Sequence, residues 1–427
     1  MSCKNYILLK MNTKQNFFDH LDGGWGDVIA DTYRESNAFK PPYKKSTYND
    51  ETLIELAERY DNNPELVENK ELYFENGLEY IPGYSFYKTN IIGDLIFPNS
   101  LKQIGMCAFA NCKKLKGDLI FPNSLKQIGM FAFANCIGFK GSLELPEGLK
   151  LIKHNAFKNT GFTGDLIIPD SVTELGDESF SNCKGLNGTV KVSKNISIDN
   201  DKSNGKQAFK NCTNIKKVIF ANGSKSISAF MFEYCTNLTD LEMPTGLEYI
   251  DANAFHACSS LKHIDFPKGL KIINDNAFSH CISLKSINMS DTILDLELGV
   301  FENCTSLNYV KFSENLEIIN SYCFKNCNLL EELVIPASVK NIEHFAFMNN
   351  VNLTSIHLQD GIKKIGRRAF FNCASLSGEL QIPESVDNIG SEAFMKCNFS
   401  KIFVHYDKAV KWNIDWNSGC NAEIVYY

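Results

Sequence analysis

Hydrophobic residues recur along this chain with a period of 23 or 24 residues, and a phenylalanine marks each repeat. Only one step between successive marker phenylalanines is longer, the 29 residues from Phe180 to Phe209. A fixed period of this size indicates one small structural unit stacked many times, because a single unit cannot bury its own apolar face. Fourteen phenylalanines share the spacing: Phe86, Phe109, Phe133, Phe157, Phe180, Phe209, Phe232, Phe255, Phe278, Phe301, Phe324, Phe347, Phe370 and Phe394.

Each repeat has the same internal order of apolar and polar positions. An aliphatic residue stands five places before the phenylalanine, a small residue usually just before it, a cysteine usually three places after it, and a leucine usually six places after it. In Ile264-Asp265-Phe266 apolar and polar residues then alternate, which predicts a short β-strand. Pro267 ends that strand because it lacks a backbone donor. Strands of successive repeats should pair in parallel, about 4.8 Å apart, so that phenylalanine lies over phenylalanine in one continuous core.

The residues of one repeat carry a resemblance to a known family. The pattern Cys-x-x-Leu-x-x-Ile-x-Phe-Pro-x-x-Leu-x-x-Ile-x-x-x-Ala-Phe-x-x-Cys resembles the leucine-rich repeat of the BspA-like, or Treponema pallidum, class, over about three-quarters of the chain. The resemblance implies a curved leucine-rich-repeat solenoid of the α/β type, with about 14 repeats of 23–24 residues. It also implies a parallel sheet on one face and short helical or irregular segments on the other. Members occur in bacteria, protists and large DNA viruses, and several are adhesins or binding proteins.

The repeat divides the chain into three predicted parts. These are an N-terminal cap or docking segment with one helix (1–72), the solenoid (73–404) and a C-terminal cap (405–427). The N-terminal helix is expected from the helical spacing of Leu53, Leu56, Ala57 and Tyr60.

Two further features fall in or after the solenoid. An insertion lies near 193–206, where Asp199, Asp201 and Ser203 alternate as at the start of a calcium loop. Because no glutamate closes such a loop, a solvated surface insertion is favoured.

The C-terminal cap is expected to hide the open end of the core. Residues 406–412 should form a short helix and residues 422–427 a last strand, with Trp412 and Trp416 covering the last coil.

Most of the fifteen cysteines occupy one column of the repeat. Thr89, Thr160 and Asn350 hold the same position in other repeats, and none of them can form a disulfide. The column therefore favours a buried ladder of free thiols that hydrogen-bond to the backbone, over the alternatives of a disulfide framework or a zinc site. The eleven cysteines three places after a phenylalanine are Cys112, Cys136, Cys183, Cys212, Cys235, Cys258, Cys281, Cys304, Cys327, Cys373 and Cys397.

The outward positions of the predicted strands form the candidate binding surface, because repeat proteins of this type present ligand surfaces there. In the first half of the solenoid, exposed isoleucines beside aspartates predict an apolar stripe with a polar edge. The alternative is that near-identical repeats reflect recent duplication, and the N-terminal segment is a second candidate to cover the stripe. The candidate binding residues are Asp94, Ile96, Asp118, Ile120, Asp165, Ile167, Ile219, Asp240, Glu242, His263, Asp265 and Tyr309.

Composition and charge narrow the class of protein. The net charge of −7 is spread along the chain, which argues against nucleic acid or anionic membrane as a partner. No apolar stretch is long enough to insert in a membrane, and the N-terminus has no secretory apolar region, so a cytoplasmic location is expected, with cell-surface or virion association as the alternative. Asparagine is abundant, which we interpret as a trace of an AT-rich genome.

Chemical motifs give no prediction of catalysis. No phosphate-binding glycine loop, nucleophile elbow or His-Glu-x-x-His sequence is present, so we predict no catalytic residues, no metal and no cofactor. The favoured function is a non-catalytic binding or scaffold protein that holds a protein partner. A structural component or spacer of a larger assembly, with contacts made by residues 1–72, is the alternative, and an enzyme whose chemistry lies in 1–72 is a third. The partner's identity and the oligomeric state are left open.

Overall fold

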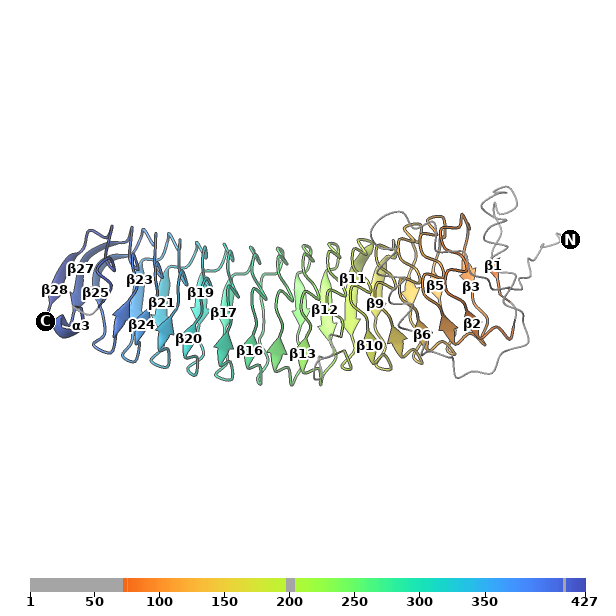
Figure 1. Ribbon diagram of the computed structural model, residues 1–427, viewed down its shortest axis with the longest axis horizontal. Coiled ribbons are helices and arrows are strands. Elements are labelled where there is room, and N and C mark those ends of the chain that lie inside the picture. Colours follow the sequence, from red (N-terminus) through yellow and green to blue (C-terminus); the bar gives the residue numbers. More distant parts are fainter. Residues whose placement is uncertain (1–71, 75, 197–203, 410–411) are drawn as a thin grey trace.

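The computed structural model describes residues 72–74, 76–196, 204–409 and 412–427. Over this part the chain winds into successive coils that stack along one long axis, with β1 and β28 at opposite ends (Figure 1). Neighbouring coils pair in parallel, which confirms the predicted solenoid. The predicted N-terminal helix and the Asp199–Asp201–Ser203 motif lie outside the described residues.

Each coil contributes to one or both of two parallel ladders. We call the first of these ladder A; its strands follow the leucine that usually stands six places after the marker phenylalanine. Its strands are β1 (Leu72–Tyr73), β3 (Leu95–Ile96), β5 (Leu119–Ile120), β7 (Leu143–Glu144), β9 (Gly164–Ile167), β11 (Leu186–Val192), β12 (Lys217–Phe220), β14 (Asp240–Glu242), β17 (Ser286–Asn288), β19 (Tyr309–Lys311), β21 (Glu332–Ile335), β23 (Ser355–Leu358), β25 (Ser377–Gln381), β27 (Asn398–Val404) and β28 (Glu423–Tyr426).

In the second ladder, ladder B, a strand lies five or six residues before every marker phenylalanine except Phe209, among the described residues. Its strands are β2 (Tyr80–Ile81), β4 (Gln103–Ile104), β6 (Gln127–Ile128), β8 (Leu151–Ile152), β10 (Glu174–Leu175), β13 (Ser226–Ile227), β15 (Tyr249–Ile250), β16 (Ile272–Ile273), β18 (Asp295–Leu296), β20 (Ile318–Ile319), β22 (Asn341–Ile342), β24 (Lys364–Ile365) and β26 (Asn388–Ile389). Ladder B was not predicted, because alternation of polar and apolar residues cannot be recognised in strands of two residues.

The core is a continuous column of aromatic rings between the two ladders. Neighbouring marker phenylalanines are nearly parallel, with ring centroids 5.0 Å apart for Phe86 and Phe109 and 5.3 Å apart for Phe255 and Phe278. Offset stacking at this separation is a favourable arrangement for aromatic rings. The aliphatic residues of ladder B, such as Ile250 and Ile273, are completely buried beside the column. In-register stacking therefore buries the apolar side chains of each coil against those of the coils on either side.

The third side of each coil is a turn around the phenylalanine. In the coil of Phe255, Asn253 and Ala257 have φ angles of 56° and 57°, and their amides donate to backbone carbonyls of the next coil. The Phe255 amide donates to the Ala277 carbonyl in the same way, at 2.9 Å. Short helical or irregular segments were expected on this side, and the segments are irregular. The one helix among the described residues is α3 (Tyr406–Ala409).

The strand predicted at Ile264–Phe266 is not present, and this prediction was wrong. Side chains still alternate, with His263 and Asp265 exposed and Ile264 buried, but the residues form no ladder with β14 or β17. The spacing of the rings does not account for this, because the rings of Phe278 and Phe301 are 5.8 Å apart and the strands that follow them, β17 and β19, still pair. Ladder B also stays paired here, through β15, β16 and β18, so the coil keeps its place in the stack.

The last coils follow the sequence prediction closely. Helix α3 begins at Tyr406 as predicted, and β28 lies at Glu423–Tyr426, paired with β27. Trp412 and Trp416 are each 7% exposed, and the Trp416 ring packs edge-on against Phe394, the last of the stacked phenylalanines. The two tryptophans therefore lie where the ring column ends.

Candidate interaction surface

The predicted binding residues lie on the outward side of ladder A. Ile96, Ile120 and Ile167 are 46%, 55% and 52% exposed, because each follows a buried leucine in a short strand. The other predicted positions are also exposed, except Ile219, which is half-buried within the four-stranded part of the ladder. We call Ile96, Ile120, Ile167 and Ile219 the isoleucine stripe.

Strand register shows which side chains neighbour the stripe. Ile120 lies beside Glu144, and Ile167 lies beside Lys191. Ile219 lies between Lys191 and Glu242. The stripe is therefore interrupted by charges of both signs and is not one continuous apolar surface.

Two of the predicted aspartates also join one coil to the next. Asp118 Oδ1 accepts hydrogen bonds from the Ser142 amide at 2.6 Å and from the Ser142 hydroxyl at 3.0 Å. Asp165 Oδ1 accepts a hydrogen bond from the Thr189 amide at 2.7 Å. A hydrogen bond to a charged group contributes about 1.5–3 kcal/mol, so these carboxylates stabilise the stack as well as shaping its surface.

The same joint explains why a glycine stands one coil after each of these aspartates. A Cβ atom built on Gly141 would lie 2.2 Å from Asp118 Oδ1, and one on Gly188 would lie 2.0 Å from Asp165 Oδ1. The aspartate of one coil therefore requires a glycine in the next. The sequence shows these glycines, but the aspartates were interpreted only as the polar edge of a binding stripe or as a trace of duplication.

An asparagine column was also missed from the sequence. Asn135, Asn159 and Asn326 stand two places after a phenylalanine, with φ angles of 55–61°, a region that asparagine adopts more readily than most residues. The side-chain amide of Asn135 donates to Asn111 Oδ1 at 3.2 Å, and that of Asn326 donates to Asn303 Oδ1 at 2.6 Å. Part of the asparagine content is therefore structural, and its interpretation as genome composition alone was incomplete.

The cysteine column is a ladder of buried free thiols, as predicted. The thiol of Cys112 donates to the Phe86 carbonyl of the preceding coil at 2.8 Å, and Asn350 Nδ2 makes the equivalent bond to Phe324 at 3.0 Å. Burial raises the pKa of Cys112 and of Cys281 to about 12. Because the thiolate is the reactive species, these cysteines are poor nucleophiles and poor metal ligands.

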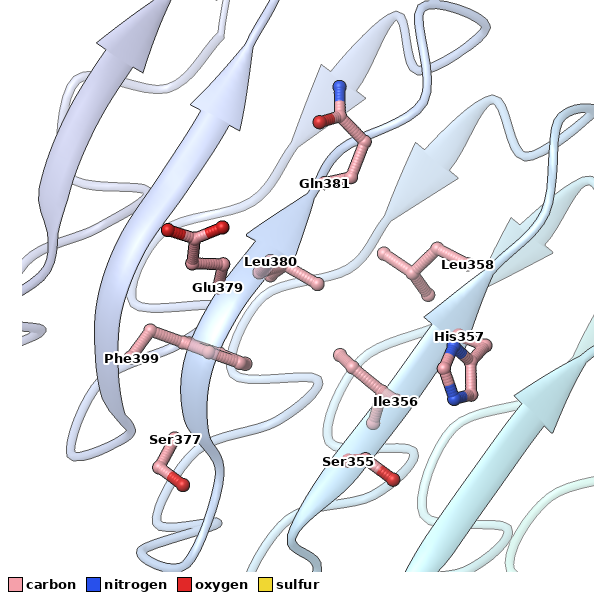
Figure 2. A pocket seen from close by; sticks show the side chains of 9 residues that line it. All are labelled: Ser355, Ile356, His357, Leu358, Ser377, Glu379, Leu380, Gln381 and Phe399. Atoms are coloured by element: carbon pink, nitrogen blue, oxygen red, sulfur yellow. The ribbon is translucent and has the colours of Figure 1, made fainter.

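A hollow of about 250 Å³ opens in ladder A between β23 and β25, which are not hydrogen-bonded to each other (Figure 2). Its apolar lining comes from Ile356, Leu358, Leu380 and Phe399. His357 and Glu379 line it from different strands, and in Figure 2 their side chains do not point toward one another. The hollow therefore shows no paired acid and base.

The described residues contain no group of three or more histidine, cysteine, aspartate or glutamate side chains placed to hold a metal ion. Nor does any helix in the described part of the chain have the length and hydropathy needed to cross a bilayer.

Comparisons with known proteins agree with the fold. The model of the BspA type leucine rich repeat region matches residues 65–187, 188–308 and 296–411. A leucine-rich repeat protein from Bacteroides ovatus superimposes with a TM-score of 0.60 at 21% identity, over 91% of each chain. One from Eubacterium ventriosum gives a TM-score of 0.49 at 22% identity, over 74% of this chain and 86% of the other.

A further solved structure, the Treponema pallidum leucine rich repeat protein, is 25% identical, with a TM-score of 0.31 over 44% of this chain and 82% of that one. No curated protein matches the sequence. Repeats of this type typically serve in protein interaction or as scaffolds, and they are typically non-catalytic. The repeat pattern, the parallel stack and the match to most of the chain lead to one conclusion: this chain belongs to the BspA-type leucine-rich repeat family.

Proposed function

We propose that the protein is a non-catalytic binding or scaffold protein that holds a protein partner on the outward side of ladder A, in the first half of the solenoid. The observation that carries this proposal is the set of exposed isoleucines at Ile96, Ile120 and Ile167, held at the same strand position in different coils. A single exposed aliphatic residue means little, but a recurring column of them supports an interaction site.

The backbone around the stripe supports binding at low entropic cost. Ile120 and Ile167 lie on strands that pair in parallel with their neighbours, and the carboxylates of Asp118 and Asp165 bond each coil to the next. A surface whose backbone is already ordered loses little freedom when a partner binds.

The charges beside the stripe define the chemistry of the partner. Glu144, Lys191 and Glu242 alternate with the isoleucines, and Glu242 forms an ion pair with Lys217. A protein surface with aliphatic or aromatic anchors, and with charges of both signs between them, fits this order. Such charges set orientation and specificity more than affinity.

Substituting Ile120→Lys together with Ile167→Lys should weaken binding of the partner at least about tenfold, because two apolar anchors are lost and two charges must be desolvated. The partner is first identified by affinity purification from the native source followed by cross-linking. Its affinity is then measured by calorimetry with the full-length protein. The matched control is Asn288→Lys with Val334→Lys, since both residues are exposed at the equivalent outward position of later coils.

Unchanged affinity in the Ile120/Ile167 variant would remove the stripe as the binding site. If the partner is instead lost only when residues 1–72 are deleted, a spacer or assembly component with contacts made by that segment is the better description. Equal weakening in the stripe variant and the control would indicate a general effect of added charge and would also contradict the proposal.

A further inference from the structure

A second exposed apolar surface lies on ladder B, on the coil that contains Leu294 and Leu298. These side chains are 47% and 43% exposed. Leu294 occupies a column that otherwise holds mostly charged residues. At the equivalent place, seven residues before the phenylalanine, other coils carry Lys102, Lys126, Lys150, Lys225, Glu248, Lys271, Glu317, Lys340, Lys363 and Asp387. An aliphatic residue here is therefore a departure from the repeat.

Neighbouring coils extend this apolar surface. In ladder B, Tyr249 lies beside Ile272, and Ile272 lies beside Asp295, which directly follows Leu294. The next coil brings Ile318 next to Asp295, because Leu296 pairs with Ile319. Tyr249 and Ile318 are 39% and 37% exposed. Apolar side chains thus lie on four successive coils.

Three acidic side chains lie within this surface. Asp295 and Glu297 alternate with Leu294 and Leu298 along the chain, and Asp275 Oδ1 accepts a hydrogen bond from the Leu298 amide at 3.0 Å. The three acids are neighbours, because Asp295 and Glu297 are two residues apart and Asp275 bonds to the residue that follows Glu297. Burial, and then the charges of Asp275 and Asp295, raise the pKa of Glu297.

The acids have no basic partner among the described residues. No described lysine or arginine forms an ion pair with Asp275, Asp295 or Glu297. The lysine of the preceding coil, Lys271, is engaged by Glu248 at 2.5 Å. We call Tyr249, Ile272, Leu294, Leu298 and Ile318, with these three acids, the Leu294 patch.

We propose that the Leu294 patch binds a cationic amphipathic segment of another protein, in which lysine or arginine alternates with aliphatic or aromatic residues. Exposed aliphatic side chains supply the apolar contacts, and the unpaired acids between them are complementary to basic side chains at the same spacing. The isoleucine stripe differs, because its charges have both signs. The patch is thus a second surface, independent of the function proposed above.

The test uses the full-length protein and a fluorescein-labelled synthetic peptide in which lysine alternates with leucine, followed by fluorescence anisotropy at low and high salt. Leu294→Lys with Leu298→Lys should weaken binding about tenfold, because apolar contacts are lost and the acids gain basic neighbours. The substitutions suit the fold, since Lys271 and Arg367 occupy the same columns in other coils. A circular dichroism spectrum checks each variant.

Two further variants separate the patch from the chain's overall negative charge. Asn288→Lys with Val334→Lys adds the same charge on ladder A, outside both proposed surfaces, and should leave the peptide affinity within about twofold. Asp295→Asn with Glu297→Gln should reduce the dependence of binding on salt, because two charges that attract the peptide are removed.

Three results would overturn the proposal. Equal weakening by both lysine pairs would indicate attraction to net charge alone. Equal binding of a peptide in which glutamate alternates with leucine would show that the acids do not select the ligand. Self-association of the wild-type protein that Leu294→Lys with Leu298→Lys abolishes would show that a second copy of this chain covers the patch.

Discussion

Replacing Phe278 with alanine is expected to lower the free energy of unfolding by about 3–5 kcal/mol. The ring is completely buried and lies between Phe255 and Phe301, at centroid distances of 5.3 and 5.8 Å. Phe266 packs edge-on against it at 5.8 Å. Truncation leaves a cavity in the middle of the column, and neighbouring rings cannot close it because ladder B and the backbone hydrogen bonds of the phenylalanine turns hold their coils in place.

Urea denaturation followed by circular dichroism measures this loss. The control is Tyr309→Ala, whose side chain is 55% exposed and whose loss should change stability by no more than about 0.5 kcal/mol. Equal effects of the two substitutions would mean that Phe278 does not point into a packed core.

Replacing Cys281 with aspartate is expected to destabilise the protein by roughly 3–5 kcal/mol, because a carboxylate would be buried without a basic partner. The Cys281 thiol is completely buried and donates a hydrogen bond to the Phe255 carbonyl at 3.4 Å. An ionised carboxylate at this place could not donate to the Phe255 carbonyl, so two hydrogen-bond acceptors would face each other and repel. It would either remain protonated, with a raised pKa, or force the coils apart.

Cys281→Thr is the matched control, because Thr89 and Thr160 already hold this column and donate to backbone carbonyls. Its effect should stay below about 1.5 kcal/mol. Thermal unfolding of both variants checks the prediction. A threonine variant as unstable as the aspartate variant would show that the column requires sulfur itself and not a small buried donor.

The sequence predicts the core better than the surface, and the reason is physical. Burial restricts each core column to one kind of side chain, so Phe278 and Cys281 have counterparts at the same distance along the chain. Direction within a strand follows from alternation, which placed Ile120 and Ile167 outward correctly.

What the sequence did not reveal depends on contacts between coils. The bond from the Ser142 amide to Asp118 joins residues 24 apart in the chain, and the asparagine ladder joins Asn303 to Asn326 in the same way. Such contacts appear only when residues one period apart are compared as pairs. The missing strand at Ile264–Phe266 could not be predicted either, because these residues alternate in the same way as those of coils that do form a strand.

Removing one whole coil tests most directly whether the protein is a linear stack of coils in register. Deleting residues 256–278 joins Phe255 to Ser279 and keeps the repeat pattern intact. Because each coil contacts only its neighbours, this variant should fold and unfold cooperatively on heating, as monitored by circular dichroism. Deleting residues 256–267, about half a period, should lower the unfolding temperature further than the whole-coil deletion, because the coils on the two sides of the junction no longer meet in register. Loss of folding in the whole-coil deletion, or equal unfolding temperatures for the two deletions, would contradict in-register stacking.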